Sequence, residues 1–184
     1  MNWKNTTDRY GSLSISMHWL MLALLIGVYA CIELRGFYPK GSDLRESLKT
    51  WHFMLGLSVF ALVFVRLAIR FVTPSPQMSP HIAAWQHHLA GLMHAVLYVF
   101  LIVMPLLGWL TLSASDKVIS FFGLELPSLI GPDKAFANSL KEIHQTIGTI
   151  GYYLIGLHAA AALYHHYFVR DDTLLRMLPQ RGKV

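Results

Sequence analysis

Four long apolar runs constrain what this chain can fold into more than any other feature of its sequence. They cover residues 13–34, 51–72, 89–112 and 143–169. A helix needs about 20 predominantly apolar residues to cross the hydrocarbon core of a bilayer, and a spanning segment must satisfy its backbone hydrogen bonds internally. The runs therefore predict an all-α integral membrane protein in which residues 1–184 form one domain, a bundle of four transmembrane helices.

The composition also indicates a membrane protein. Hydrophobic residues make up 54% of the chain and charged residues 14%, whereas a soluble domain carries about 25% charged residues. The first run is too long for the core of a signal peptide, and no small-residue cleavage site follows it, so we expect it to remain as a span. The expected surroundings are a lipid bilayer, and no nucleic-acid partner is expected.

Four spans place both termini on the same side of the membrane. Lys and Arg residues are divided almost equally between the two sides, so the positive-inside rule favours cytoplasmic termini only slightly. The longest connection, about 113–142, contains the stretch VISFFGLELPSLIG, which is apolar but too short to span. We expect this stretch to form an interfacial or re-entrant cover.

The cysteine content excludes two classes of redox centre. Cys31 is the single cysteine in the chain and lies inside the first apolar run. The sequence has no C-x-x-C-H motif, which excludes covalent attachment of a c-type haem. It also has no cluster of cysteines, which excludes an iron–sulfur centre.

Four of the ten histidines lie at matched depths in the apolar runs. His18 and His158 lie near the side of the termini, whereas His52 and His144 lie near the opposite side. His144 and His158 are separated by about 21 Å along one helix and lie within about 40° of the same helix face. Helix geometry therefore predicts two pairs, His18 with His158 and His52 with His144, one near each membrane surface.

Paired imidazoles that face each other across a bundle are suitable axial ligands for haem iron. We therefore predict two non-covalent b-type haems, with the four histidines as the ligands of the iron. Each ligating ring needs an acceptor for its second nitrogen, and the sequence does not identify that acceptor. The alternative for any single histidine is a hydrogen bond between helices, but four histidines at matched depths favour haem.

Two glycines and one arginine are further candidates for the cofactor sites. Gly56 follows His52, and Gly148 follows His144, by one helical turn, so each glycine shares a face with its histidine. A glycine there leaves room for a flat macrocycle, with close helix packing as the alternative. Arg66 lies at the depth of the other pair and needs a partner. We expect a haem propionate, with snorkelling to the interface as the alternative.

The other histidines have no assigned role: His81, His87, His88, His94, His165 and His166. His94 lies within the third run without a partner at its depth, and we expect it to support a ligand, handle protons or pack. His165 and His166 end the fourth run and either carry protons or lie at the interface. The remaining three are expected to be solvated.

Five segments of the sequence resemble the bacterial di-haem cytochrome b561 family. They read YGSLSISMHWLM, LRGFYPKG, WHFMLGLSVFALVFVRLAIR, IHQTIGTIGYYLIGLHAAAALYHHYF and DDTLLRMLP. The four liganding histidines of the family fall on His18, His52, His144 and His158. The resemblance implies a multi-pass protein of the bacterial inner membrane with both termini in the cytoplasm, and one bundle is sufficient to hold both haems as a monomer.

The resemblance to the enterobacterial members implies an oxidoreductase that takes electrons from superoxide at the periplasmic haem and reduces ubiquinone. The sequence identifies no catalytic residue. Three lysines of the long connection, Lys117, Lys134 and Lys141, are candidates to attract a small anion. The alternative is that these lysines are solvated and paired with the acidic residues beside them.

Two other functions are compatible with the sequence. A cytochrome b subunit would take electrons from a redox protein, passing them between a dehydrogenase or hydrogenase partner and the quinone pool, and would be inactive alone. A histidine-lined transporter is the third interpretation. The sequence has no broken-helix repeat and no acidic residue deep in a run, and both observations argue against a transporter.

Overall fold

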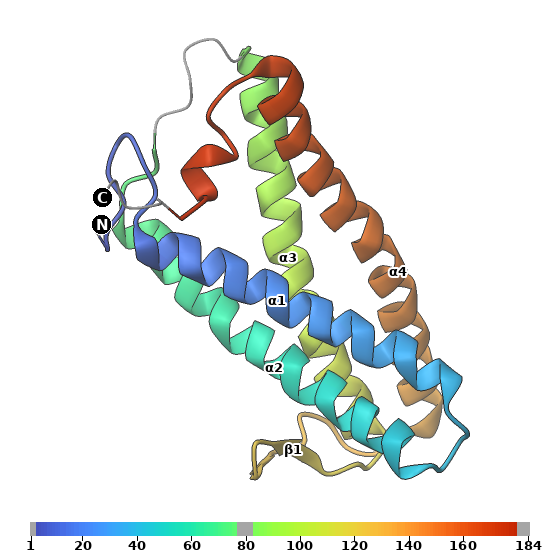
Figure 1. Ribbon diagram of the computed structural model, residues 1–184. Coiled ribbons are helices and arrows are strands. Elements are labelled where there is room, and N and C mark those ends of the chain that lie inside the picture. The colour runs from blue at the N-terminus through green and yellow to red at the C-terminus, as the bar shows by residue number, and fades with distance from the viewer. Residues whose placement is uncertain (1–2, 77–82, 180–184) are drawn as a thin grey trace.

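Four long helices dominate the computed structural model, which describes residues 3–76 and 83–179 (Figure 1). Their bounds are α1 Ser12–Leu34, α2 Asp43–Val72, α3 Ala84–Ala114 and α4 Lys134–Tyr164. All four helices are long and apolar enough to cross a membrane. The prediction of an all-α membrane protein built on four spanning helices is confirmed.

Two helices begin well before the apolar runs that they contain. α2 begins at Asp43 and α4 begins at Lys134, so both extend beyond the predicted spans into the connecting segments. The carboxylate of Asp133 accepts a hydrogen bond of 2.9 Å from the backbone N–H of Phe136 and caps α4. An acidic side chain at this position also interacts favourably with the positive end of the helix dipole.

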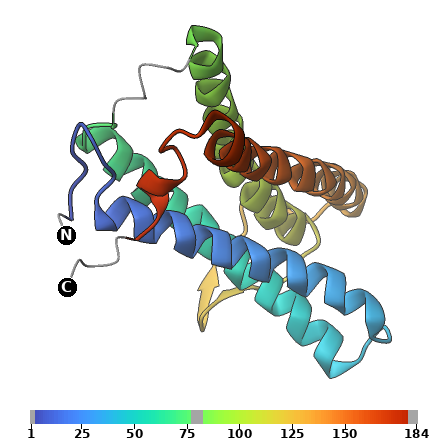
Figure 2. The same cartoon turned by 45° about the horizontal axis from the view of Figure 1, so that its top comes forward.

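The helices pack as two pairs, α1 with α2 and α3 with α4, and the pairs meet through α2 and α3 (Figures 1 and 2). The start of α1 and the segment that follows α4 lie at the same end of the bundle, called here the termini end (Figure 1). The opposite end carries the connection between α1 and α2 and a small β-hairpin. Both ends of the described chain therefore lie on one side of the spanning region.

A small apolar cluster lies where α1, α2 and α3 meet. Met21, Val59 and Val63 are buried there, and Leu101 and Ile102 of α3 pack against them. Many large apolar side chains elsewhere on the helices are exposed on the surface of the bundle. This distribution fits a protein whose outer face contacts lipid and whose helices are held together by close packing.

α4 comes into close contact with α1 and α3 at Gly151. A Cβ atom on this residue would overlap the hydroxyl group of Tyr29 and the ring of Phe100. The Tyr29 hydroxyl also donates a hydrogen bond of 2.8 Å to the backbone carbonyl of Gly148, one turn earlier in α4. The missing side chain of Gly151 thus lets three helices approach one another at a level between the two predicted histidine pairs.

The connection between α3 and α4 contains a hairpin of two short antiparallel strands, β1 (Ile119–Phe121) and β2 (Leu124–Leu126). The turn residues Phe122 and Gly123 both have positive φ values, 48° and 87°, as a tight hairpin turn requires. Sequence reasoning predicted an apolar cover here but no strands. The stretch predicted as a cover is a folded hairpin that packs on the outside of the helices.

We expect Gly151→Ala to destabilise the bundle by about 1–3 kcal/mol, because an added methyl group in a close-packed interior forces its neighbours to move. Thermal unfolding in detergent should show a lowered midpoint. Gly156→Ala is a matched control on the same helix, because a Cβ atom there meets no atom within 4 Å. Equal midpoints for the two variants would contradict the close contact at Gly151.

Candidate functional site

The structure brings the four predicted histidines together in two pairs. His52 of α2 and His144 of α4 have ring centroids 6.2 Å apart, with an angle of 74° between the ring planes. His18 of α1 and His158 of α4 have ring centroids 6.3 Å apart, with an angle of 65°. One face of α4 therefore supplies a histidine to each pair, and α2 and α1 supply the partners.

The separation of the rings fits two imidazoles on one metal ion. A histidine nitrogen binds a metal at about 2 Å, so two rings on opposite sides of one ion have centres about 6 Å apart once a ring radius of about 1 Å is added. Among residues 3–76 and 83–179, no group of three or more His, Cys, Asp or Glu side chains is arranged to hold a bare metal ion. Two ligands per site suit haem, in which the macrocycle supplies the other ligands of the iron.

The His52 ring has the second-nitrogen partner that the sequence did not identify. His52 Nδ1 lies 2.9 Å from the backbone carbonyl oxygen of Val28 in α1. A carbonyl only accepts hydrogen bonds, so Nδ1 carries the proton and donates it. This tautomer leaves the lone pair of His52 Nε2 available for iron and fixes the orientation of the ring.

His18 has a different partner, because Arg66 Nη2 lies 3.2 Å from His18 Nδ1. A guanidinium group only donates hydrogen bonds, so Nδ1 of His18 is here the acceptor. Arg66 Nε also donates to the hydroxyl of Tyr98 at 3.3 Å. Arg66 Nη1 is buried and has no hydrogen-bond partner within the described part of the chain. A buried cationic donor beside this pair suits an anionic group such as a haem propionate.

A fifth histidine joins the pair at the termini end. The ring of His94, in α3, has its centroid 5.6 Å from that of His158, with an angle of 68° between the planes. Sequence reasoning left His94 without a partner, although the depth argument that grouped the other four histidines also places it here. His94 is thus a neighbour of a predicted ligand and contributes a third imidazole to this end.

A cavity lies beside the His52–His144 pair. Its lining includes both histidines together with Gly56, Gly108 and Ile119. A Cβ atom at Gly56 would meet no atom within 4 Å, so this predicted glycine faces open space. A Cβ atom at Gly108 of α3 would lie 3.4 Å from the His144 ring. Sequence reasoning missed Gly108, because it lies on a different helix from the histidine that it approaches.

Gly148 contacts a side chain rather than open space. A Cβ atom on it would lie 3.4 Å from Cε of Met104 in α3. This contact supports the alternative stated for the glycines, close packing between α3 and α4.

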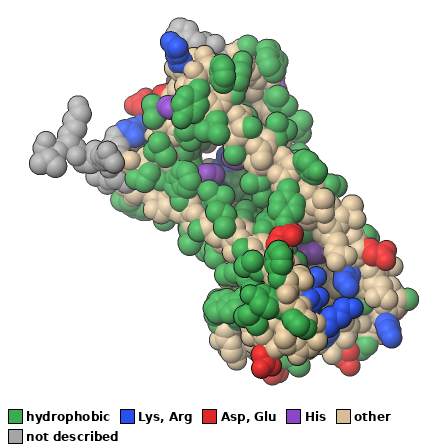
Figure 3. Space-filling view, turned by 45° about the vertical axis from the view of Figure 1, so that its right-hand side comes forward, with side chains coloured by type: hydrophobic (Ala, Val, Ile, Leu, Met, Phe, Trp, Pro, Cys, Tyr) green, Lys and Arg blue, Asp and Glu red, His purple; other side chains and the backbone are tan. Residues whose placement is uncertain are grey.

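On the surface of the molecule, apolar side chains predominate and some polar groups lie recessed among them. Histidine side chains lie recessed among apolar ones, and Lys and Arg side chains gather at the end opposite the termini (Figure 3). His87 and His88, at the start of α3, are exposed, as expected. His81 lies outside the described residues.

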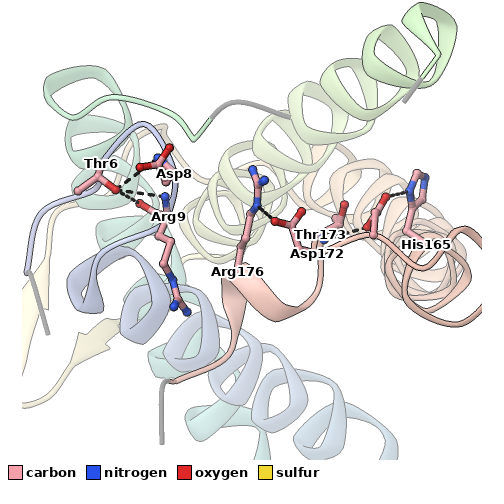
Figure 4. Close-up of polar contacts among 8 residues, drawn as sticks. Thr6, Asp8, Arg9, His165, Asp172, Thr173 and Arg176 are labelled. Atoms are coloured by element: carbon pink, nitrogen blue, oxygen red, sulfur yellow. Dashed lines mark hydrogen bonds and ion pairs between the residues drawn. The ribbon is translucent and has the colours of Figure 1, made fainter. Parts of the chain in front are cut away.

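The segment after α4 folds back towards α1 at the termini end. His165 Nδ1 lies 2.5 Å from a carboxylate oxygen of Asp171, and the indole N–H of Trp19 donates a hydrogen bond of 2.7 Å to the carbonyl of Met177. Figure 4 shows His165, Asp172 and their neighbours along this segment. His165 therefore has a structural partner, whereas His166 Nδ1 is buried with no hydrogen-bond partner within the described part of the chain.

The charge of Asp171 depends on these contacts. Burial acts to raise the pKa of the Asp171 carboxyl, but hydrogen bonds from His165 and from Thr173 outweigh burial and hold the pKa below its usual value. A lowered pKa means that the ionised carboxylate stabilises the folded segment above about pH 4. This stabilisation is lost as the pH falls through the lowered value.

We expect Asp171→Asn to loosen the segment, because the neutral amide loses the charge-assisted hydrogen bond with His165. Amide hydrogen exchange of residues 171–179 should become several-fold faster at neutral pH. The difference from the wild type should vanish at acidic pH, where protonation removes the same charge. Asp172→Asn is the neighbouring control, because Asp172 forms a more exposed pair with Arg176. Equal exchange in both variants would contradict the anchoring role of Asp171.

Comparison with known proteins gives full-length matches. A family model described as prokaryotic cytochrome b561 matches residues 9–180. Cytochrome b561 homolog 1 from Escherichia coli (strain K12) is 40% identical over 174 residues, 95% of this chain and 99% of the relative. Probable superoxide oxidase CybB from Yersinia pestis is 36% identical over 173 residues, 94% and 97% of the two chains. Cytochrome b562 from Cereibacter sphaeroides is 27% identical over 176 residues, 94% and 96%.

Proposed function

Because this chain belongs to the prokaryotic cytochrome b561 family, as its sequence segments predicted, we propose that it oxidises superoxide at one membrane surface and reduces ubiquinone through two b-type haems. The family and its relatives support the coarser statement, a multi-pass b-type cytochrome for transmembrane electron transfer. Four features go beyond this statement and are proposals: the number of haems, the electron donor, the electron acceptor and the orientation of the protein in the membrane. We place the protein in the bacterial inner membrane with the termini in the cytoplasm.

The observation that supports two haems is the presence of two histidine pairs with nearly equal ring separations, 6.2 and 6.3 Å. The pairs lie about 21 Å apart along α4. A b-type haem supplies one-electron chemistry when it is bound. In the proposed arrangement His52 and His144 ligate one iron, and His18 and His158 ligate the other.

Two further groups of this chain act at the proposed haem sites, the Val28 carbonyl and the Arg66 guanidinium. The Val28 carbonyl keeps Nε2 of His52 free of a proton. At the other pair, iron binding through Nε2 of His18 requires Nδ1 to become a donor, which the Arg66 contact prevents. We therefore propose that Arg66 turns from His18 to a haem propionate, where its buried Nη1 also gains a partner.

The lysines at the end opposite the termini support an anionic donor. Lys117, Lys134 and Lys141 form no ion pair with Asp116, Asp133 or Glu142 in the described part of the chain. Their positive charges remain available to attract superoxide, which carries one negative charge. Two superoxide anions lose one electron each, and one quinone gains these two electrons with two protons to become quinol.

The name of the Yersinia pestis relative, probable superoxide oxidase, supports superoxide as the donor. The alternative remains a cytochrome b subunit that receives electrons from a dehydrogenase or hydrogenase partner. The two functions differ in one measurable respect. An oxidase acts alone, whereas a subunit needs its partner protein.

The haem content of the purified protein tests the histidine assignment. We expect two b-type haems per chain in a reduced-minus-oxidised spectrum combined with haem quantification. His18→Ala and His52→Ala should each lose one haem, because each removes one of the two histidines that would hold it. His94→Ala is the matched control, since this imidazole lies beside His158 but is not assigned to iron. Loss of a haem from His94→Ala with retention in His18→Ala would reassign the ligand, and wild-type protein without haem would refute the proposal.

Isolated protein should reduce a short-chain ubiquinone when superoxide is generated in solution. Lys117→Gln should lower this rate by about two- to tenfold at low ionic strength, because electrostatic attraction between a cation and an anion speeds their encounter. Added salt should reduce the difference between variant and wild type, since salt screens exposed charges. Haem-loaded protein that is inactive alone would favour the partner-dependent subunit.

A further inference from the structure

We propose that the β1–β2 hairpin is seated in the lipid interface on the side opposite the termini, and that this seat holds Ile119 as a lid on the His52–His144 cavity. The partner is the acyl and headgroup boundary of the bilayer. The proposal depends on packing and exposure of the hairpin, and not on the identity of the electron donor or acceptor.

The hairpin lies beside the spanning helices rather than beyond their ends. Ile119 packs in a buried cluster with Leu57 of α2 and Leu112 of α3. Leu57 is six residues past Trp51, where the apolar run of α2 begins, and six residues correspond to about 9 Å along a helix. The hairpin therefore reaches the depth at which the surface of α2 already contacts lipid. Figure 1 shows it projecting sideways below α2.

The two faces of the hairpin differ in polarity. Strand pairing aligns Ile119 with Leu126 and Ser120 with Glu125, so apolar side chains share one face and the polar pair occupies the other. Ile119 is 2% exposed, whereas Leu124, on the same face but nearer the turn, is 66% exposed. The apolar face thus begins against the helices and continues outward beyond them.

Lipid is the partner that fits this exposed apolar face. Through Ile119 this face adjoins Leu57 of α2 and Leu112 of α3, and the turn residue Phe122 is also 59% exposed. The hydrocarbon core would leave the open strand edges without hydrogen bonds. At the boundary, water and headgroups reach the polar face and the strand edges, while acyl chains surround the apolar side chains.

The seated hairpin also closes the cavity. Ile119 lines it together with both histidines of the pair. The strands are fixed to α3 on their C-terminal side, because the indole N–H of Trp109 donates a hydrogen bond of 3.0 Å to the carbonyl of Pro127. With one side tied to α3 and the turn held by lipid, Ile119 stays over the cavity and keeps water out.

Spin-label accessibility tests the seat. Leu124→Cys is labelled with a nitroxide in a Cys31→Ala background, with the full-length, haem-loaded protein in nanodiscs of phosphatidylcholine and phosphatidylglycerol. We expect collisions with oxygen, which dissolves in lipid, to exceed collisions with a water-soluble nickel chelate. Glu125→Cys is the matched control on the polar face, and its ratio should be several-fold lower. Equal ratios at both positions would show a hairpin standing in water, and label shielded from both reagents would show a protein partner; either result overturns the proposal.

Thiol reactivity tests the lid. Ile119→Cys should react slowly with a charged, membrane-impermeant thiol reagent in the same nanodiscs. Adding Leu124→Asp should speed the reaction at least several-fold, because a carboxylate withdraws the hairpin from the acyl chains. Glu125→Gln in place of Leu124→Asp should leave the slow rate unchanged. Equal rates in the two double variants would overturn the link between the lipid seat and the lid, whatever the outcome of the superoxide assay.

Discussion

The exclusion of water from the hydrocarbon core is the constraint on which the rest of this structure depends. Backbone groups there must bond within their own segment, so each span is a helix with a fixed rise per residue. Position along the sequence then becomes depth in the membrane. Because one face of α4 carries His144 and His158 at two depths, α2 and α1 need only pass opposite this face to bring His52 and His18 to them.

Spacing along a straight helix was sufficient to predict the four helices and the two histidine pairs, but it left out His94, which lies beside His158. The same reasoning fails wherever a position depends on contacts between helices. Val28 acts on His52 through a backbone carbonyl, which every residue has, and Gly108 approaches His144 from another helix. The hairpin was missed as strands because its turn uses Phe122 at a positive φ, a conformation that a bulky residue rarely adopts.

The two histidine pairs have different electrostatic surroundings. His52 meets a neutral carbonyl group, whereas the guanidinium of Arg66 lies against the pair at the termini end. A positive charge stabilises an electron added nearby, and charge around a haem is one of the features that set its potential. In the proposed function, the propionate that Arg66 binds offsets this charge, so the two sites differ in their surroundings rather than by a free cation at the termini end.

The apolar layer between the pairs has a consequence for the energetics of the membrane. Met21, Val59 and Val63 are buried there, and Gly151 brings α4 into contact with Tyr29 and Phe100. Close-packed apolar side chains disfavour a continuous file of water molecules, and protons and ions need such a file to cross. Electrons move between cofactors without displacing atoms. In the proposed function, this apolar layer would hinder ionic current while electrons pass between the haems, so charge transfer would proceed while the ion gradient is preserved.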